Sequence, residues 1–256
     1  MKTLGIIPAR FASTRFPGKP LALLSGKPMI QWVWERVSQS NSLDEVIVAT
    51  DDLRIAECVN SFGGQARITR DDHLSGTDRC AEVLASYKPG AWSCVLNIQG
   101  DEPFIRPDMI DQLSALMSAK PDIEIATLAC KINNLEQLHN PNVVKLVADV
   151  KGRALYFSRH PIPFARGVSP EHWMEAYSYL QHIGLYGFRA ALLPMLTKLP
   201  PGRLEKAESL EQLRWLENGY AIAVAQTEYA LLGVDTPEDL DAAQEKWMLE
   251  SGKNKI

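Results

Sequence analysis

The sequence lacks the features that mark several large classes of protein. Four of its 256 residues are cysteine, and they form no CxxC pair. Scattered cysteines in apolar surroundings are usually buried reduced thiols, so we predict neither a disulfide nor a zinc site. No apolar run approaches the roughly 20 residues of a membrane span, and the N-terminal run is too short for a signal peptide. We therefore expect a cytoplasmic protein that does not insert into membranes.

An excess of charge of one sign is also missing. The chain has 27 Lys and Arg against 31 Asp and Glu, a net charge of -4, so it has no overall basic field and nucleic-acid binding is disfavoured. Two familiar phosphate-binding motifs are absent. The Walker pattern would need Gly at position 13 and Ser or Thr at position 20, where the chain has Ser13 and Pro20. The dinucleotide motif GxGxxG does not occur, which disfavours a dinucleotide-dependent oxidoreductase.

What the sequence does have is a cationic loop directly behind its first apolar strand. The stretch LGIIPARFASTRFPGK begins with four apolar or small residues, and Pro8 then ends the strand. Arg10, Arg15 and Lys19 follow among small residues that let the backbone approach a ligand closely. A solvated basic loop is the ordinary alternative, but the position behind a buried strand favours a polyphosphate site.

The rest of the chain alternates between strand-like and helix-like segments. Strands are predicted over residues 4–7, 45–50, 66–69, 92–99, 125–131, 179–188 and 221–227. Helices are predicted over residues 29–38, 51–59, 78–87, 107–119, 190–197 and 206–218, and from 236 onward. Residues 143–150 and 154–158 interrupt this rhythm as an antiparallel pair. The pattern predicts a doubly wound α/β fold with a mixed, mostly parallel sheet flanked by helices and a small inserted antiparallel sub-domain.

We expect one domain over residues 1–256. Residues 1–130 and 200–256 would form a nucleotide-binding core, and 131–199 an insertion. Ligands of open α/β sheets bind outside the carboxyl ends of the strands, which places the cationic loop and Asp101 along one rim. Asp101 stands in the frame GDEP behind an uncharged strand, and Asp235 stands in the similar frame GVDTP. Each would ordinarily be a turn or helix-cap residue, but together beside a triphosphate they could share one Mg²⁺ ion.

A family resemblance rests on motifs that run through almost the whole chain. They are, in order, IIPARFASTRFPGKPL, GKPMIQ, VIVATDD, HLSGTDR, VLNIQGDEP, NPNVVK, ALYFSR, HIGLYGFR, ESLEQLR and GVDTPEDL. The sequence resembles the 3-deoxy-manno-octulosonate (KDO) cytidylyltransferases, which have a nucleotide-diphospho-sugar-transferase-like fold. The resemblance implies that CTP and KDO give CMP-KDO and diphosphate for lipopolysaccharide synthesis, with Mg²⁺ as cofactor. It also implies a homodimer, with the insertion contributing to sugar binding and to the dimer interface.

The resemblance assigns roles to individual positions. The residues implied to bind CTP are Arg10, Ser13, Arg15, Lys19, Ser75, Gly76 and Arg79. Those implied to bind KDO are Gln99, Arg159, His182, Tyr186, Glu211 and Gln212. Asp101 and Asp235 would hold the metal, and with Arg15 and Lys19 they would form the catalytic set.

Other readings of the same residues remain open. His182 alone would more often be a satisfied core histidine, Arg159 a surface ion-pair residue, and Glu211 part of a solvated helix face. Related enzymes that activate sialic acid or 8-amino-KDO are the nearest alternatives for the substrate. A non-catalytic nucleotide-binding protein is disfavoured, because both acids and all three loop cations are present.

Overall fold

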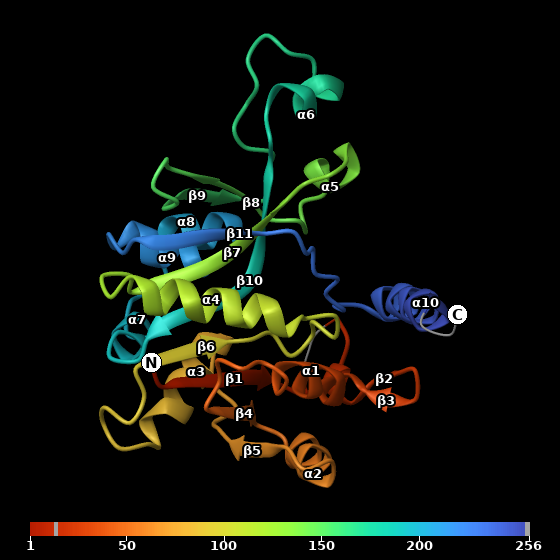
Figure 1. The fold of residues 1–256 in the computed structure, drawn as a ribbon, viewed down its shortest axis with the longest axis vertical. Coiled ribbons are helices and arrows are strands. Elements are labelled where there is room, and N and C mark those ends of the chain that lie inside the picture. The colour runs from red at the N-terminus through yellow and green to blue at the C-terminus, as the bar shows by residue number, and fades with distance from the viewer. Residues whose placement is uncertain (13–14, 254–256) are drawn as a thin grey trace. The chain divides into compact units, whose positions relative to one another are not determined.

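The computed structural model describes residues 1–12 and 15–253. Its fold is the predicted α/β class, a mixed and mostly parallel β-sheet flanked by helices, with a small two-stranded antiparallel sheet beside it (Figure 1). The chain divides into two compact units. The first comprises Met1–Asp111 with Leu231–Ile256, and the second comprises Gln112–Ala230. Each unit is built around its own part of the sheet.

The first unit contains four parallel strands in the order β6–β1–β4–β5. Its central strand β1 (Thr3–Ala9) is almost completely buried, as expected for a parallel strand covered on both faces. The strand predicted over residues 92–99 is shorter here, since β6 covers only Cys94–Asn97. The other two strands are β4 (Glu45–Thr50) and β5 (Gln65–Ile68).

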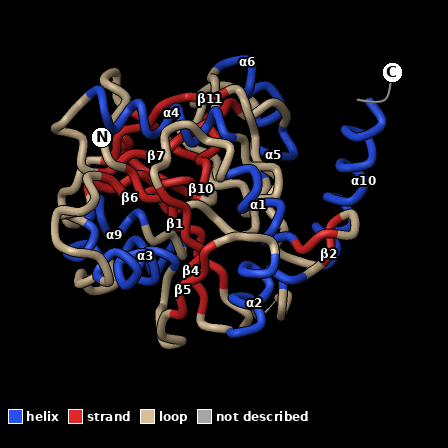
Figure 2. Tube along the Cα trace, turned by 60° about the horizontal axis from the view of Figure 1, so that its bottom comes forward, coloured by secondary structure: helices blue, strands red, loops and turns tan. Residues whose placement is uncertain are grey.

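Helices and one hairpin complete the first unit. The helices are α1 (Met29–Val37), α2 (Leu53–Ser61), α3 (Gly76–Ala85) and α10 (Pro237–Lys253), and a 3-10 turn η1 covers Lys19–Leu21. Strands β2 (Leu23–Leu24) and β3 (Lys27–Pro28) pair through Ser25 and Gly26, whose positive φ angles suit a two-residue hairpin turn. Helix α10 lies beside this hairpin in both views (Figures 1 and 2). Helix α4 (Pro107–Ala119) begins in the first unit and ends in the second.

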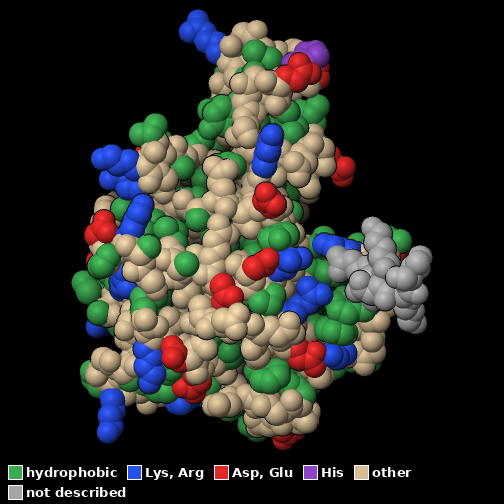
Figure 3. Space-filling model, in the orientation of Figure 1, with side chains coloured by type: hydrophobic (Ala, Val, Ile, Leu, Met, Phe, Trp, Pro, Cys, Tyr) green, Lys and Arg blue, Asp and Glu red, His purple; other side chains and the backbone are tan. Residues whose placement is uncertain are grey.

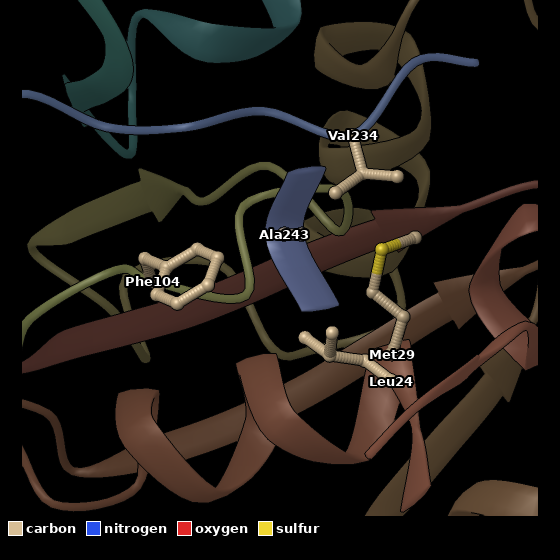
Figure 4. Packing of buried hydrophobic residues seen from close by; sticks show 5 residues of the cluster. All are labelled: Leu24, Met29, Phe104, Val234 and Ala243. Carbon is tan, nitrogen blue, oxygen red and sulfur yellow. The ribbon is translucent and has the colours of Figure 1, made fainter. Parts of the chain in front are cut away.

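A small apolar cluster joins distant parts of the first unit. Leu24, Met29, Phe104, Val234 and Ala243 are buried, and Figure 4 shows the side chains of the first four around the segment of α10 that carries Ala243. Leu24 and Met29 follow the cationic loop, Phe104 follows Asp101, and Val234 directly precedes Asp235. Burial of this cluster therefore ties together the three segments that carry the predicted site.

The second unit is built on antiparallel pairing with one parallel edge. Strand β7 (Ile125–Lys131) pairs in parallel with β11 (Ile222–Thr227) and antiparallel with β10 (Leu180–Arg189). Strand β10 also pairs with β8 (Lys145–Ala148), which pairs in turn with β9 (Ala154–Ser158), so the predicted antiparallel pair is confirmed. The remaining elements are α5 (Leu135–His139), η2 (Pro170–His172), α6 (Trp173–Ala176), α7 (Leu193–Leu196), α8 (Arg203–Glu208) and α9 (Gln212–Glu217).

One predicted helix is wrong. Residues 206–218 were expected to be continuous, but α8 ends at Glu208, and Ser209 after it adopts a left-handed conformation with φ of 52°. The Arg159 guanidinium donates to the carbonyl oxygens of Glu208 and Ser209 at 2.7 and 3.3 Å. These bonds satisfy carbonyls that a continuing helix would use, and the break buries Gln212.

The distribution of surface charge and the state of the cysteines are typical of a globular protein. Acidic and basic side chains are interspersed on the face shown in Figure 3. The four cysteines are free thiols, and burial raises the pKa of Cys130 to about 11. Among the described residues, no helix combines the length and apolarity that a membrane crossing requires.

Candidate active site

A cavity of about 310 Å³ lies in the first unit, beside the carboxyl ends of β1 and β6 and the start of α3. This is the edge of the sheet where the sequence placed the site. Of the residues predicted to bind CTP, the metal or the sugar, those lining the cavity are Arg10, Arg15, Lys19, Ser75, Gly76, Arg79, Gln99, Asp101 and Asp235. Ser13 lies outside the described residues.

Close backbone packing brings Asp101 to this cavity. A Cβ atom on Gly100 would come within 2.7 Å of the Pro8 carbonyl oxygen, so only glycine allows the segment after β6 to lie against the end of β1. The cationic loop is closed by a hydrogen bond from the Gly18 amide to the Phe11 carbonyl at 2.9 Å. Gly18 has a φ of 72°, and the turn it makes leads directly into Lys19.

The predicted catalytic residues form one cluster of four charges. The Lys19 ammonium donates to Asp101 Oδ2 at 2.6 Å and to Asp235 Oδ1 at 3.0 Å. Arg15 Nη2 donates to Asp235 Oδ2 at 2.9 Å. Burial by itself would lower the pKa of Lys19, but the two carboxylates outweigh it and raise that pKa. Burial would likewise raise the pKa of Asp235, but hydrogen bonding and charge from Lys19, with help from Arg15, lower it.

The segment that carries Asp235 is fixed on both sides. The Val234 amide donates to the Asp101 carbonyl oxygen at 2.9 Å, which links the two acid-bearing segments through the backbone. The amides of Asp235 and Thr236 both donate to Asp239 Oδ2, at 3.0 and 2.9 Å. With Thr236 Oγ1, which accepts from the Asp239 amide at 3.2 Å, this carboxylate forms a capping box at the start of α10 and holds the backbone of Asp235.

Glu102 is a further acid at this position that the sequence did not single out. A Cβ atom on Gly233 would lie 3.1 Å from Glu102 Oε1, so the two segments pack closely here. Glu102 Oε2 is buried and has no hydrogen-bond partner among the described residues. Burial, aided by the charges of Asp101 and Asp235, raises the pKa of Glu102 well above its usual value, which favours the neutral acid.

The donor groups of this cluster fit a magnesium ion. Two carboxylates from different segments converge on one cationic atom, the Lys19 ammonium, which stands in for a cation at that position. Mg²⁺ is commonly held by one or two carboxylates together with substrate phosphates and water. In the described part of the chain no group of three or more His, Cys, Asp or Glu side chains gathers as a metal cluster. Asp101 and Asp235 would therefore be the protein's contribution.

The start of α3 forms another wall of the cavity. Ser75 and Asp78 make a capping box, in which Ser75 Oγ accepts from the Asp78 amide at 3.2 Å and Asp78 Oδ2 accepts from the Ser75 amide at 3.0 Å. Arg79 is 3% exposed and bonds to the Thr69 hydroxyl, the Arg70 carbonyl and Asp51. These bonds hold residues 69–79 in place beside the cavity.

Two of the predicted sugar-binding residues lie on β10 of the second unit. Burial lowers the pKa of His182 to about 3, so its ring is neutral near pH 7. Its Nε2 atom lies 3.0 Å from Thr127 Oγ1, and its ring packs against Phe157 and Tyr186. Burial raises the pKa of Tyr186 well above 10.0, and its hydroxyl is buried with no hydrogen-bond partner among the residues described. A buried hydroxyl of this kind is available to a ligand or to water.

Three more of them, Arg159, Glu211 and Gln212, meet at the break between α8 and α9, which Arg159 reaches from the segment after β9. Arg159 donates through Nε, Nη1 and Nη2 to the carbonyls of Glu208, Pro141 and Ser209. A guanidinium has five N–H groups, so these bonds leave two. Glu211 is half-buried at the N-cap of α9, and Gln212 is 5% exposed at its first position. Gln212 was expected on a polar helix face, and the break turns it inward instead.

Known proteins resemble this chain closely. The cytidylyltransferase sequence model matches residues 4–224. The 3-deoxy-manno-octulosonate cytidylyltransferase of Parabacteroides distasonis is 50% identical over 247 residues, covering 95% of this chain and 97% of the relative. That of Thermodesulfovibrio yellowstonii is 51% identical over 249 residues, covering 95% and 97%. The chain belongs to the 3-deoxy-manno-octulosonate cytidylyltransferase family.

A solved structure agrees with this assignment. The CMP:2-keto-3-deoxy-manno-octonic acid synthetase complexed with CTP superimposes with a TM-score of 0.90 at 42% identity, covering 98% of this chain and 100% of that one. The family predicted from the motifs is therefore confirmed, and with it the nucleotide-diphospho-sugar-transferase-like fold.

Family motifs also mark residues that our sequence reading passed over. His73 and Leu74 line the cavity and belong to the motif HLSGTDR, in which roles were predicted for Ser75, Gly76 and Arg79. The His73 ring bonds to Glu82, which steadies the loop before α3. Glu102 belongs to GDEP, directly after Asp101. Membership of these motifs was the sequence signal that could have identified His73, Leu74 and Glu102 as site residues. Their burial and contacts, in contrast, depend on the fold.

Proposed function

We propose that this protein transfers the cytidylyl group of CTP to KDO, giving CMP-KDO and diphosphate. The observation that carries the proposal is the roughly 50% identity, over 95% of the chain, to enzymes of that name. The anomeric hydroxyl of KDO attacks the α-phosphorus in line, a new P–O bond forms, and the bond to the departing diphosphate breaks. The hydroxyl proton is released, and no covalent intermediate with the protein is needed.

The chain's own cations would carry the phosphate chemistry. Arg10, Arg15 and Lys19 line the cavity, where they would bind the triphosphate and neutralise the charge that grows on departing diphosphate. The amides at the start of α3 lie at the same cavity, and with Ser75 and Gly76 they would enclose the cytosine. Arg79 is engaged in holding residues 69–79, so we assign it a positioning role.

Asp101 and Asp235 would hold Mg²⁺, as their convergence on the Lys19 ammonium supports. When bound, Mg²⁺ supplies positive charge to the phosphate oxygens and lowers the pKa of the attacking hydroxyl. The protein's part is to fix the two carboxylates, through the Val234–Asp101 backbone bond and the Asp239 cap.

Residues of the second unit would recognise the sugar acid. The two remaining N–H groups of Arg159 suit the KDO carboxylate, since a guanidinium and a carboxylate form parallel charge-assisted bonds. Tyr186 would offer its unpartnered hydroxyl, and neutral His182 and the amide of Gln212 would contribute polar contacts, with Glu211 beside them. Gln99 keeps its predicted role toward KDO.

We also propose that the enzyme is a cytoplasmic homodimer. Apolar side chains exposed on the second unit support a contact surface there. Val150 is fully exposed, and together with half-exposed Tyr177 it lines a shallow hollow of about 410 Å³. Leu155 on β9 is 61% exposed.

The test is a diphosphate-release assay with CTP, ATP, GTP and UTP against KDO, 8-amino-KDO and N-acetylneuraminate. We expect turnover with CTP, KDO and Mg²⁺ together, and loss of turnover in the Asp101→Asn variant. Faster turnover with N-acetylneuraminate or 8-amino-KDO would assign the protein to those substrates. No turnover with any combination would leave a nucleotide-binding protein without activity.

A further inference from the structure

The ammonium group of Lys19 occupies the place between the two carboxylates that would hold the metal. It lies 2.6 Å from Asp101 and 3.0 Å from Asp235, and its side chain is 12% exposed. Arg15 reaches Asp235 as well, but its side chain is 59% exposed, so solvent screens that pair more strongly. Lys19 is therefore the principal counter-ion of both acids.

In this arrangement the Lys19 ammonium and a divalent cation would compete for the same two carboxylates. Two carboxylates carry two negative charges, and Lys19 with Arg15 already neutralises them. A divalent cation bound by the same carboxylates would lie a few ångströms from the ammonium, where like charges repel strongly in a partly buried setting. A carboxylate oxygen that accepts a hydrogen bond at 2.6 Å is also less available as a metal ligand.

A nucleotide bound in the cavity would offer the Lys19 ammonium a second set of anionic partners, the phosphate oxygens. Lys19, Arg15 and Arg10 line the same space of about 310 Å³, so a triphosphate bound there presents several anionic oxygens to them. Lysine is a point charge on a flexible four-carbon stem, and it can move from a carboxylate to a phosphate without a backbone change. That movement would free Asp101 and Asp235 when phosphate ligands for the metal arrive.

We propose that Lys19 is an internal counter-ion that competes with divalent metal in the free protein and moves to the phosphates of bound nucleotide. Nucleotide and metal then bind with positive coupling, and the free protein binds metal weakly. This proposal rests on the metal assignment made above. It adds that the order and cooperativity of ligand binding are set by one lysine.

The experiment measures Mn²⁺ binding by the electron paramagnetic resonance of free Mn²⁺, with the full-length protein and no nucleotide. Lys19→Met, which keeps most of the length of the side chain and removes its charge, should bind Mn²⁺ about 5- to 150-fold more tightly than wild type. Lys27→Met is the matched control, because Lys27 is also ion-paired, at 2.6 Å to Glu35, and does not line the cavity. It should bind Mn²⁺ like wild type.

A second measurement adds CTP, corrected for the Mn²⁺ that free CTP binds. The ratio of the Mn²⁺ dissociation constants without and with CTP should be larger in wild type than in Lys19→Met. The tighter Mn²⁺ binding expected of Lys19→Met should disappear in a double variant that also carries Asp101→Asn. Lys19→Gln is the replacement variant if circular dichroism shows that Lys19→Met does not fold.

Two results separate the possible failures. If Lys19→Met and Lys19→Gln bind Mn²⁺ no more tightly than wild type, while Asp101→Asn weakens Mn²⁺ binding to the CTP complex, the counter-ion proposal is wrong and the metal site stands. If Asp101→Asn leaves Mn²⁺ binding to the CTP complex unchanged, the metal assignment itself is wrong, and the proposal for Lys19 fails with it.

Discussion

At the scale of single residues, the proposed chemistry depends on two aspartates that come from distant segments. Asp101→Asn and Asp235→Asn keep the size of each side chain and remove its charge. We expect each to lower kcat by about 10²- to 10⁴-fold, because either change weakens metal-based stabilisation of the transition state. If, as proposed, the two acids hold one ion, the double variant should cost much less than the sum of the single variants. Steady-state kinetics over a range of Mg²⁺ concentrations measures this.

Asp52→Asn is the control for these variants. Asp52 also follows a strand of the first unit, but its carboxylate caps α2 and does not line the cavity. Asparagine caps a helix about as well as aspartate, so this variant should keep wild-type turnover. Full activity of Asp235→Asn, with an unchanged response to Mg²⁺, would reduce Asp235 to a turn residue.

The ion pairs of Lys19 also predict a pH dependence of stability. The pKa of Asp235 is lowered below 3.8, so its contribution is present above that ordinary value and is lost as the pH falls through the lowered pKa. The pKa of Lys19 is raised above 10.5, so its contribution is present below that value and is lost as the pH rises through the raised pKa.

The difference in unfolding free energy between wild type and Lys19→Met should therefore be constant from about pH 5 to about pH 9. It should shrink in stronger acid and in stronger base. Urea unfolding at a series of pH values measures the difference, and a clear change within the neutral range would count against these pairs as its source.

At the scale of elements, the apolar cluster around Val234 places Asp235. Val234→Ala removes two methyl groups from a fully buried position, which should cost about 1.5 to 3 kcal/mol of stability. Because Asp235 is the next residue, its carboxylate should also shift, and kcat should fall about 10- to 100-fold. Urea unfolding and steady-state kinetics measure the two effects.

Val59→Ala provides the comparison. Val59 is equally buried, but it lies on α2, away from the cavity. The Val59→Ala variant should lose a similar free energy of unfolding, and its kcat should stay at the wild-type value. Equal kcat in the two variants would mean that the cluster stabilises the fold without positioning Asp235.

Residues at the start of α3 both cap the helix and line the cavity, and mutation can separate these two roles. Ser75→Ala and Asp78→Ala each break the capping box, and each should cost about 0.5 to 2 kcal/mol. Ser75 also lines the cavity, whereas Asp78 does not. We therefore expect Ser75→Ala alone to raise the KM for CTP. If both variants changed the KM equally, Ser75 would act only as a helix cap.

At the scale of the whole molecule, the exposed apolar residues of the second unit predict self-association. Val150→Asp should convert a dimer to a monomer in sedimentation equilibrium, since a charge at the centre of an interface is costly to bury. Folding of each chain should be unaffected, because Val150 is fully exposed. Leu53→Asp, at an exposed apolar position of the first unit, should leave the dimer intact. A monomeric wild type, or a dimer that survives Val150→Asp, would contradict the proposal.

The predicted and observed helices and strands show which structural features can be read from local sequence patterns. Buried parallel strands, amphipathic helices and the antiparallel pair of the second unit were predicted within a few residues, because their periodicity is local information. The helix over residues 206–218 failed, although Leu210, Leu213 and Leu216 have helical spacing. Its break at Ser209 is accompanied by Arg159, which comes from about 50 residues earlier in the chain and bonds the local carbonyls. A tertiary contact of this kind leaves no periodic signal.

The sequence by itself determined the family, the α/β class, the cationic loop and the two aspartates, since these depend on residue types, their order and local patterns. Only the tertiary structure decided that Lys19 lies between Asp101 and Asp235, that the Oε2 atom of Glu102 is buried, and that Gln212 turns inward. The reason is physical. The distance between residues far apart in the chain is set by which apolar side chains bury one another, as Leu24, Phe104 and Val234 do here, and that choice belongs to the whole packed unit.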